Sequence, residues 1–159
     1  MNGTPLQNPP QTGGIAPEFT AASTSGSEVS LSSFRGKSSV LLAFFPLAFT
    51  GTCTKELICF TEDFDQFVGL GVEILPISVD STASLREFKN KLGMKTELLS
   101  DFRRDISRAY GVLNEERFYS NRAYFLIDRE GRVRWAHIEA SNSHRRENSE
   151  IIAAIAQLG

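Results

Sequence analysis

Residues 40–53 read VLLAFFPLAFTGTC, and this stretch decides how the chain folds. Its first part, Val40–Phe45, is an unbroken apolar run, which indicates a strand buried on both faces. Residues 54–68 place apolar side chains at helical spacing, so we expect a helix that holds Cys53 in its first turn and ends near Gly69. A buried strand that leads directly into a helix is typical of an α/β domain.

The position of Cys53 favours a reactive thiolate. Unpaired backbone N–H groups and the positive end of the helix dipole stabilise negative charge at a helix start. The alternative is an inert buried thiol, which is the usual role of a free cysteine. Thr50 favours the reactive interpretation, because its hydroxyl can reach the sulfur or an oxygen bound beside it while the residue also serves as N-cap. Pro46 ends the strand and, in the same interpretation, shields the sulfur from water.

The other segments predict the remaining elements of one α/β domain. Residues 72–79 indicate a second parallel strand, in which Pro76 marks a bulge or an edge. Ser84 and Glu87 have capping-box spacing at the start of a helix that stops at Gly93. The sequence also predicts an early hairpin around residues 23–27, a short helix at 105–110, a hairpin of 123–127 with 133–137, and a final helix at 151–158.

Composition excludes several classes of function. The chain has 159 residues, of which 41% are apolar, enough for one core without disulfides or metals. A net charge of −2 gives no electrostatic basis for binding nucleic acid or an anionic membrane surface. The longest apolar run, Val40–Phe49, is too short to cross a bilayer, so no membrane partner is expected. Residues 1–34 contain no Lys or Arg, unlike a signal or transit peptide, so we expect a cytoplasmic, reducing compartment.

The pattern Pro46-x-x-x-Thr50-x-x-Cys53 resembles the active-site signature of the peroxiredoxins. Within that family, residues 44–51 are most similar to the alkyl hydroperoxide reductase E type, which has one catalytic cysteine. Three further segments resemble family segments in the family's order, and together the likeness covers about residues 14 to 158: Gly14–Phe19, Leu98–Asp101 and Asn121–Ala123.

The resemblance implies a thioredoxin-like three-layer α/β/α fold with a central mixed sheet, formed by residues 14–159. Residues 1–13 are expected to be a disordered extension, because residues 1–12 are rich in Pro, Gly, Asn and Gln and lack hydrophobic periodicity. It also implies a thiol peroxidase that reduces hydrogen peroxide and alkyl hydroperoxides through a sulfenic acid on Cys53. Thr50 and Arg122 would hold the peroxide and the thiolate, and Pro46 would shield them.

Glu56 matches an acidic position of the same subfamily and could orient Arg122 through a carboxylate–guanidinium pair. Its alternative role is that of an acidic residue in a first helical turn, favoured by the helix dipole. For Arg122 itself, the alternative is a solvated surface arginine.

The family's partners are implied in the same way. No bound cofactor is needed, and an external thiol reductant (thioredoxin, glutaredoxin or a low-molecular-weight thiol) would return the sulfenic acid to thiol. Residues 47–49 are apolar although they lie in a loop, which predicts burial in a contact. The family often places this loop and the segment 101–110 at a two-fold interface, so we expect a homodimer with Phe49 near the contact.

Cys59 has two possible roles. On a regular helix its Cα lies about 10 Å from that of Cys53, beyond the limit of about 7 Å for a disulfide. Cys59 is therefore either an incidental packing residue or a resolving cysteine that reacts after the helix unwinds locally. Cys59 is also expected to be more exposed than Cys53, because it shares a helix side with Asp63 and Gln66.

Other kinds of site and function fit less well. Two cysteines at this spacing with His137 and His144 make no convincing zinc set. A thioredoxin-type Cys-x-x-Cys motif is missing, because position 56 is Glu. A non-catalytic redox sensor or holdase on the same fold is the functional alternative, and catalytic rather than stoichiometric peroxide consumption would separate the two.

Overall fold

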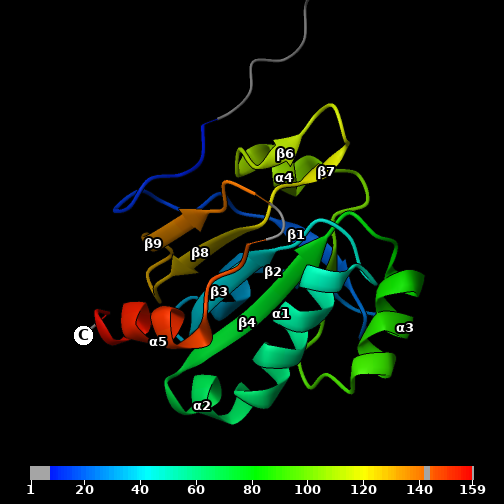
Figure 1. The fold of residues 1–159 in the computed structure, drawn as a ribbon. Coiled ribbons are helices and arrows are strands. Elements are labelled where there is room, and N and C mark those ends of the chain that lie inside the picture. The colour runs from blue at the N-terminus through cyan, green and yellow to red at the C-terminus, as the bar shows by residue number, and fades with distance from the viewer. Residues whose placement is uncertain (1–7, 142–143, 159) are drawn as a thin grey trace, which may run out of the picture.

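A mixed seven-stranded sheet lies at the centre of the computed structural model, which describes residues 8–141 and 144–158 (Figure 1). The strand order is β2-β1-β5-β4-β3-β8-β9. Strands β3, β4 and β5 are parallel, and β8 is antiparallel to β3. The strands are β1 (Thr20–Ser23), β2 (Glu28–Ser30), β3 (Ser39–Phe44), β4 (Val72–Ser78), β5 (Leu99–Ser100), β8 (Ala123–Ile127) and β9 (Val133–Ile138).

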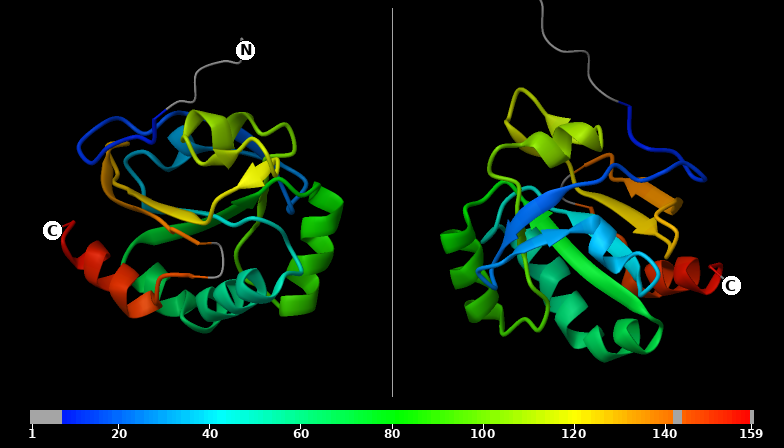
Figure 2. Two further views of the ribbon diagram at one scale, coloured as in Figure 1. Left: turned by 45° about the horizontal axis from the view of Figure 1, so that its top comes forward. Right: turned by 180° about the vertical axis from the view of Figure 1, so that it is seen from behind.

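Helices cover both faces of the sheet. One face carries α1 (Gly51–Glu62), α2 (Phe64–Gly69), α3 (Thr82–Leu92) and α5 (Asn148–Ala156), seen together on one side of the sheet in Figure 2. The other face carries the short 3-10 helix η1 (Leu31–Phe34) and α4 (Asp105–Ala109), next to the small sheet of β6 (Leu113–Asn114) and β7 (Tyr119–Ser120). The expected three-layer arrangement around a mixed sheet is thus confirmed.

Strand β3 explains why the fold has three layers. All six of its residues are buried, and their side chains alternate between the two faces. Leu41 and Ala43 pack with α1, α3 and α5, whereas Val40, Leu42 and Phe44 pack with η1, α4 and the N-terminal segment. After Ser39, every position of the strand fills one of two cores, which is why the run from Val40 is continuously apolar.

The helix expected over residues 54–68 is in fact two helices, and that prediction was wrong at Asp63. This residue leaves helical geometry, with φ −101° and ψ 14°. The Asn148 side chain donates to the Cys59 carbonyl at 2.9 Å and to the Asp63 carboxylate at 2.8 Å. A distant polar side chain therefore competes for groups at the end of α1 and stabilises the break, which helical periodicity alone does not reveal.

Two local predictions about residues 76–87 have different outcomes. The capping box was assigned to the wrong serine, because Ser81 is the N-cap of α3 and its side chain accepts the Ser84 N–H. Pro76 lies inside β4, opposite Ala43, and β5 pairs with β4 only beyond it, at Ile77 and Ser78. The proline thus occupies an edge-like position in a strand that is otherwise central.

Residues 1–7 of the expected N-terminal extension lie outside the described residues. From Gly13 onward the chain runs beside β9, because the Gly13 N–H donates to the Val133 carbonyl at 2.7 Å. Ile15 then forms an antiparallel bridge with Arg132. None of the helices among the described residues is long and apolar enough to cross a membrane.

The carboxylate of Asp101 holds the start of α4. It accepts the backbone N–H groups of Ile106 at 3.0 Å and Ser107 at 2.7 Å, together with the Ser107 hydroxyl at 2.6 Å. Burial raises the pKa of the Asp101 carboxyl, and these hydrogen bonds partly oppose the rise. A buried acceptor of three hydrogen bonds ties α4 to the end of β5.

We expect Asp101→Asn to lower the free energy of unfolding by about 1–3 kcal/mol. The introduced side-chain N–H₂ would face the N–H and O–H donors of Ile106 and Ser107, and at least one of these donors would lose its acceptor. Urea denaturation followed by circular dichroism measures this difference. Asp105→Asn is the control, because Asp105 is exposed on the same short helix and should change stability by only about 0.5 kcal/mol. Equal effects of the two substitutions would contradict this role for Asp101.

Candidate functional site

Cys53 lies in the first turn of α1. The start of this helix lies beside the carboxyl end of β4 (Figure 1). Thr50 is the N-cap residue, and the first helical hydrogen bond runs from the Thr54 N–H to the Thr50 carbonyl at 2.9 Å. The N–H groups of residues 51–53 therefore lie at the open N-terminal end of the helix, where they favour negative charge. Cys53 itself is 1% exposed.

The loop before α1 is fixed to the neighbouring strand. The Phe45 N–H donates to the Ile77 carbonyl at 3.0 Å, and the Ala48 N–H donates to the Asp80 carboxylate at 2.9 Å. Phe49 has a φ of 67°, a left-handed conformation that is unusual for a bulky side chain. Strained backbone of this kind persists where surrounding contacts hold it, and it is common at functional loops.

Arg122 brings a buried positive charge to Cys53. It immediately precedes β8, whose first residue Ala123 pairs with Phe44 at the end of β3. The Arg122 Nη2 donates to the Cys53 Sγ at 2.9 Å, and the arginine side chain is 1% exposed. Burial alone would lower the pKa of Arg122, but the charges of Glu56 and Cys53 outweigh it and the pKa is raised. The guanidinium is thus a permanent cation beside the sulfur.

Glu56 lies one helical turn after Cys53 and pairs with the same guanidinium. The Arg122 Nη1 donates to Glu56 Oε1 at 2.5 Å, and the Glu56 side chain is fully enclosed. Burial raises the pKa of the Glu56 carboxyl, while the charge of Arg122 and the hydrogen bond from Tyr124 act in the opposite direction. Sulfur, guanidinium and carboxylate therefore form one buried, hydrogen-bonded cluster.

Tyr124 is the member of this cluster that sequence reasoning missed. Its hydroxyl donates to Glu56 Oε2 and accepts the backbone N–H of Arg146 at 3.0 Å. The signal was present, because residues 123–127 read AYFLI and a buried tyrosine hydroxyl needs a partner. Which partner it finds is decided only when β8 lies against α1.

Thr50 and Pro46 flank the sulfur in the chain but differ in burial. The Thr50 side chain is exposed, and its hydroxyl donates to the Leu47 carbonyl at 2.8 Å. Pro46 is buried between the end of β3 and the loop. The structure thus brings Cys53, Arg122 and Glu56 into direct contact, with Thr50 and Pro46 on the loop that leads to them.

Cys59 stands apart from this cluster, farther along α1. Both cysteines are free thiols, and Cys59 is partly exposed whereas Cys53 is buried, so the expected order of exposure is confirmed. Within residues 8–141 and 144–158, no group of three or more His, Cys, Asp or Glu side chains is arranged to hold a metal ion. His137 instead contacts the Glu139 carboxylate, with 3.2 Å between Nε2 and Oε1.

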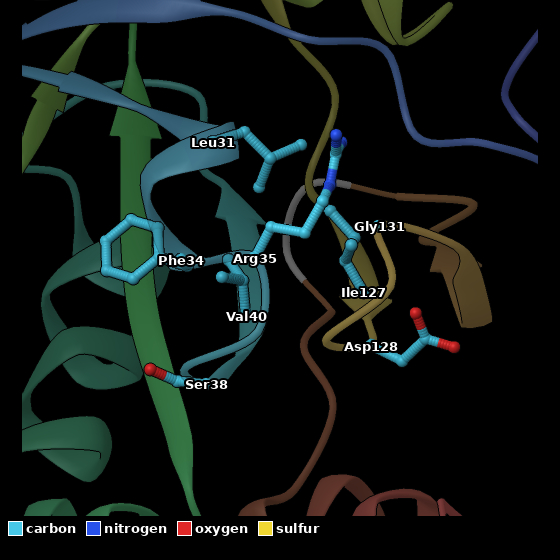
Figure 3. Close-up of a pocket in the computed structure, with 8 residues that line it drawn as sticks. All are labelled: Leu31, Phe34, Arg35, Ser38, Val40, Ile127, Asp128 and Gly131. Carbon is cyan, nitrogen blue, oxygen red and sulfur yellow. The ribbon is translucent and has the colours of Figure 1, made fainter.

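A pocket lies near the start of β3, whereas the loop to Cys53 leaves the end of that strand. Figure 3 shows the residues that line it. Val40 and Ile127 are among its lining residues, and the Arg35 guanidinium lies close to Gly131. Gly131 has a φ of 84°, a left-handed conformation that favours glycine, and an added Cβ would lie 2.8 Å from the mobile end of the Arg35 side chain. Its lining residues include no member of the cluster around Cys53, so the pocket is separate from that cluster.

Comparison with known proteins agrees with this geometry. Residues 12–136 match the model of the AhpC/TSA family. Alkyl hydroperoxide reductase E of Mycobacterium bovis is 38% identical over 129 residues, which cover 80% of this chain and 84% of the relative. Peroxiredoxin 2 of Thermoplasma acidophilum is 40% identical over 126 residues, covering 76% of this chain and 62% of the relative.

Solved structures give the same answer. The reduced 2-Cys peroxiredoxin of Plasmodium vivax superposes with a TM-score of 0.87 at 35% identity, covering 94% of this chain and 82% of that one. The mitochondrial 2-Cys peroxiredoxin of Plasmodium falciparum superposes with a TM-score of 0.81 at 33% identity, covering 91% of each chain. The sheet order, the buried thiol at a helix start and these likenesses lead to one conclusion: the chain belongs to the AhpC/TSA family and is a peroxiredoxin, a thiol peroxidase with a thioredoxin-like fold.

Proposed function

We propose that Cys53 is the peroxidatic nucleophile of this enzyme and that Arg122 activates it. The observation that carries the proposal is the 2.9 Å hydrogen bond from Arg122 Nη2 to Cys53 Sγ in a site closed to solvent. A cation and a helix N-terminus both favour thiolate over thiol. Because water is excluded, the same charges act more strongly on the sulfur than they would at a surface.

The proposed reaction transfers one oxygen atom to the sulfur. The Cys53 thiolate attacks one oxygen of a hydroperoxide, the O–O bond breaks, and the sulfur becomes a sulfenic acid. The other oxygen leaves as alkoxide or hydroxide and takes a proton from water, so the sulfur loses two electrons and the peroxide gains them. Negative charge spreads over sulfur and both oxygens in the transition state, where the fixed donors of Arg122 stabilise it.

Thr50 and Pro46 are proposed to shape the peroxide site. Since the Thr50 hydroxyl hydrogen is donated to the Leu47 carbonyl, its oxygen can accept the O–H of a hydroperoxide. The ring of Pro46 contributes no N–H and excludes water beside the sulfur. Burial of Cys53 favours small oxidants over bulky ones.

An external thiol is proposed to complete the cycle. It attacks the sulfenic acid sulfur, releases water and forms a mixed disulfide, which a second thiol reduces. Thioredoxin, glutaredoxin or a small thiol can each supply these thiols, in a reducing compartment such as the cytoplasm. Cys59 keeps two candidate roles, packing residue or resolving thiol, and its position in the last turn of α1, whereas Cys53 lies in the first, supports the role of packing residue.

We expect Cys53→Ser to abolish turnover of hydrogen peroxide, whereas Cys59→Ser leaves the first oxidation step nearly intact. Stopped-flow measurement of peroxide consumption with a thiol reductant tests both variants. Mass spectrometry after one equivalent of peroxide should show a sulfenic acid on Cys53. Loss of the first step in Cys59→Ser alone would refute the assignment, and a single stoichiometric oxidation would indicate a sensor.

We expect Arg122→Lys to slow oxidation by about 10- to 100-fold, because a point charge cannot reach the sulfur and Glu56 at once. The pKa of the Cys53 thiol should rise by about one unit, measured by thiolate absorbance. Arg108→Lys is the matched control, because Arg108 is an exposed arginine paired with Glu115. If both variants oxidise and titrate like the wild type, Arg122 has no role in activation.

We also propose that the enzyme is a homodimer that associates near the carboxyl ends of the parallel strands, where Cys53 lies. Phe49 follows β3 and Phe102 follows β5. Because both strands are parallel to β4, the two loops that carry these residues lie at the same end of the sheet. Their side chains are 52% and 61% exposed. Phe49 is also held in place by Phe88, with 4.8 Å between ring centroids. Rigid exposed aromatic residues of this kind are enriched at protein interfaces.

We expect Phe49→Glu to shift the protein from dimer to monomer in sedimentation velocity experiments, because a charge would be buried in the contact. Val68→Glu is the control: Val68 is also 52% exposed but lies on α2, and it should leave association unchanged. A wild type that is monomeric at high concentration, or a Phe49→Glu variant as dimeric as the wild type, would refute this interface.

A further inference from the structure

Arg122 divides its guanidinium between two acidic groups. Nη1 donates to Glu56 Oε1 and Nη2 donates to Cys53 Sγ. Arginine and carboxylate usually prefer a bidentate pair, in which two nitrogens bind both oxygens. In such a pair with Glu56, one N–H of Nη2 would turn to the carboxylate and draw this nitrogen away from its present position at the sulfur. The observed arrangement therefore depends on something that keeps the second oxygen of Glu56 occupied.

Tyr124 occupies that oxygen. Its hydroxyl contacts Glu56 Oε2, and its oxygen also accepts the backbone N–H of Arg146 at 3.0 Å. A phenol has one hydrogen to donate. Because Arg146 supplies a donor on one side, the hydroxyl hydrogen is directed to the carboxylate on the other. The Arg146 amide thus orients Tyr124, and Tyr124 in turn satisfies Glu56.

We propose that Tyr124 is a positioning residue: by holding Oε2 of Glu56, its hydroxyl keeps the second nitrogen of Arg122 on the Cys53 sulfur. The role in catalysis rests on the proposed function of Cys53, whereas the effect on the thiol is independent of it.

The charges around Glu56 are consistent with this role. Burial, followed by the Glu56 charge, raises the pKa of Tyr124, so the phenol remains a donor throughout the working range. Besides Arg122, the positive charge of Arg145 also acts on the Glu56 carboxyl and lowers its pKa against the effect of burial. A hydrogen bond from Tyr124 likewise favours the charged carboxylate, which is the form that holds Nη1.

The chain offers a matched control for Tyr124. Tyr110 is also fully buried, and its hydroxyl donates to the Pro17 carbonyl at 2.7 Å. It packs in the core on the other face of the sheet, with Phe44 and Phe125. Tyr110→Phe therefore removes the same buried hydroxyl without touching the Cys53 cluster.

In Tyr124→Phe, the pKa of the Cys53 thiol should rise by about one unit, since hydrogen bonds to charged groups contribute free energy of that size. Peroxide oxidation measured at least one pH unit below the wild-type thiol pKa should slow by about tenfold, because the thiolate fraction falls by that factor. Tyr110→Phe should leave both quantities at wild-type values, even if it lowers the unfolding temperature as much as Tyr124→Phe. Thiolate absorbance against pH and stopped-flow oxidation measure them separately.

A second pair of variants tests whether Tyr124 acts by keeping Arg122 Nη2 from binding Oε2 of Glu56. Glu56→Gln presents a neutral amide with one oxygen, which cannot form a bidentate pair with Arg122. Adding Tyr124→Phe to Glu56→Gln should therefore shift the thiol pKa far less than Tyr124→Phe does alone. Shifts that simply add would overturn the proposal, because Tyr124 would then act on the thiol independently of Glu56.

A fluorotyrosine at position 124 covers the case in which Tyr124→Phe fails to fold. It keeps the hydroxyl as a stronger donor, so the wild-type thiol pKa should be preserved. Thiol titration and oxidation in Tyr124→Phe that match the wild type, or a fluorotyrosine variant whose thiol pKa rises by about one unit, would overturn the proposal. Because the titration needs no turnover, this failure is distinct from a failure of Cys53 as nucleophile.

Discussion

The buried guanidinium of Arg122 is the feature on which the site depends. A cation without partners inside a protein is strongly destabilising, so its position requires acidic groups at hydrogen-bond distance. Glu56 and Cys53 supply them from one helical turn, at 2.5 Å and 2.9 Å. The pairing fixes α1 against the start of β8. It also means that the cation that must be neutralised for folding is the same one that we propose activates Cys53.

The sheet supplies the geometry that this pairing needs. The parallel strands β3 and β4 finish at the same end of the sheet, and the antiparallel strand β8 begins at that end, since Ala123 pairs with Phe44. A residue just before β8 and the first turn of the helix that follows β3 are therefore neighbours, although Arg122 and Cys53 lie 69 positions apart. The loop between β3 and α1 is held by Asp80 at the end of β4. Strands β3, β4 and β8 together therefore fix the position of the first turn of α1.

The C-terminal segment extends this network beyond the sulfur. The Arg146 N–H bonds Tyr124, and its guanidinium bonds Glu139 at 2.7 Å. Asn148 then bonds the Cys59 carbonyl and Asp63 at the end of α1. The same short region of the chain, residues 146–148, therefore supports Glu56 through Tyr124 and ends the helix that carries Cys53. This segment lies outside residues 12–136, where the family match falls.

The sequence by itself determined the elements whose signals are local. The apolar run from Val40, the helix after Cys53 and the hairpin of β8 with β9 could be predicted because periodicity and turn residues are read within one segment. The ordered family motifs likewise singled out Cys53, Thr50 and Arg122. Only the tertiary structure decided the break at Asp63 and the role of Tyr124, since both depend on residues about 20 to 85 positions away. Hydrogen bonds between distant segments leave no periodicity in a sequence, so the partner of a buried polar group is fixed only when the segments meet.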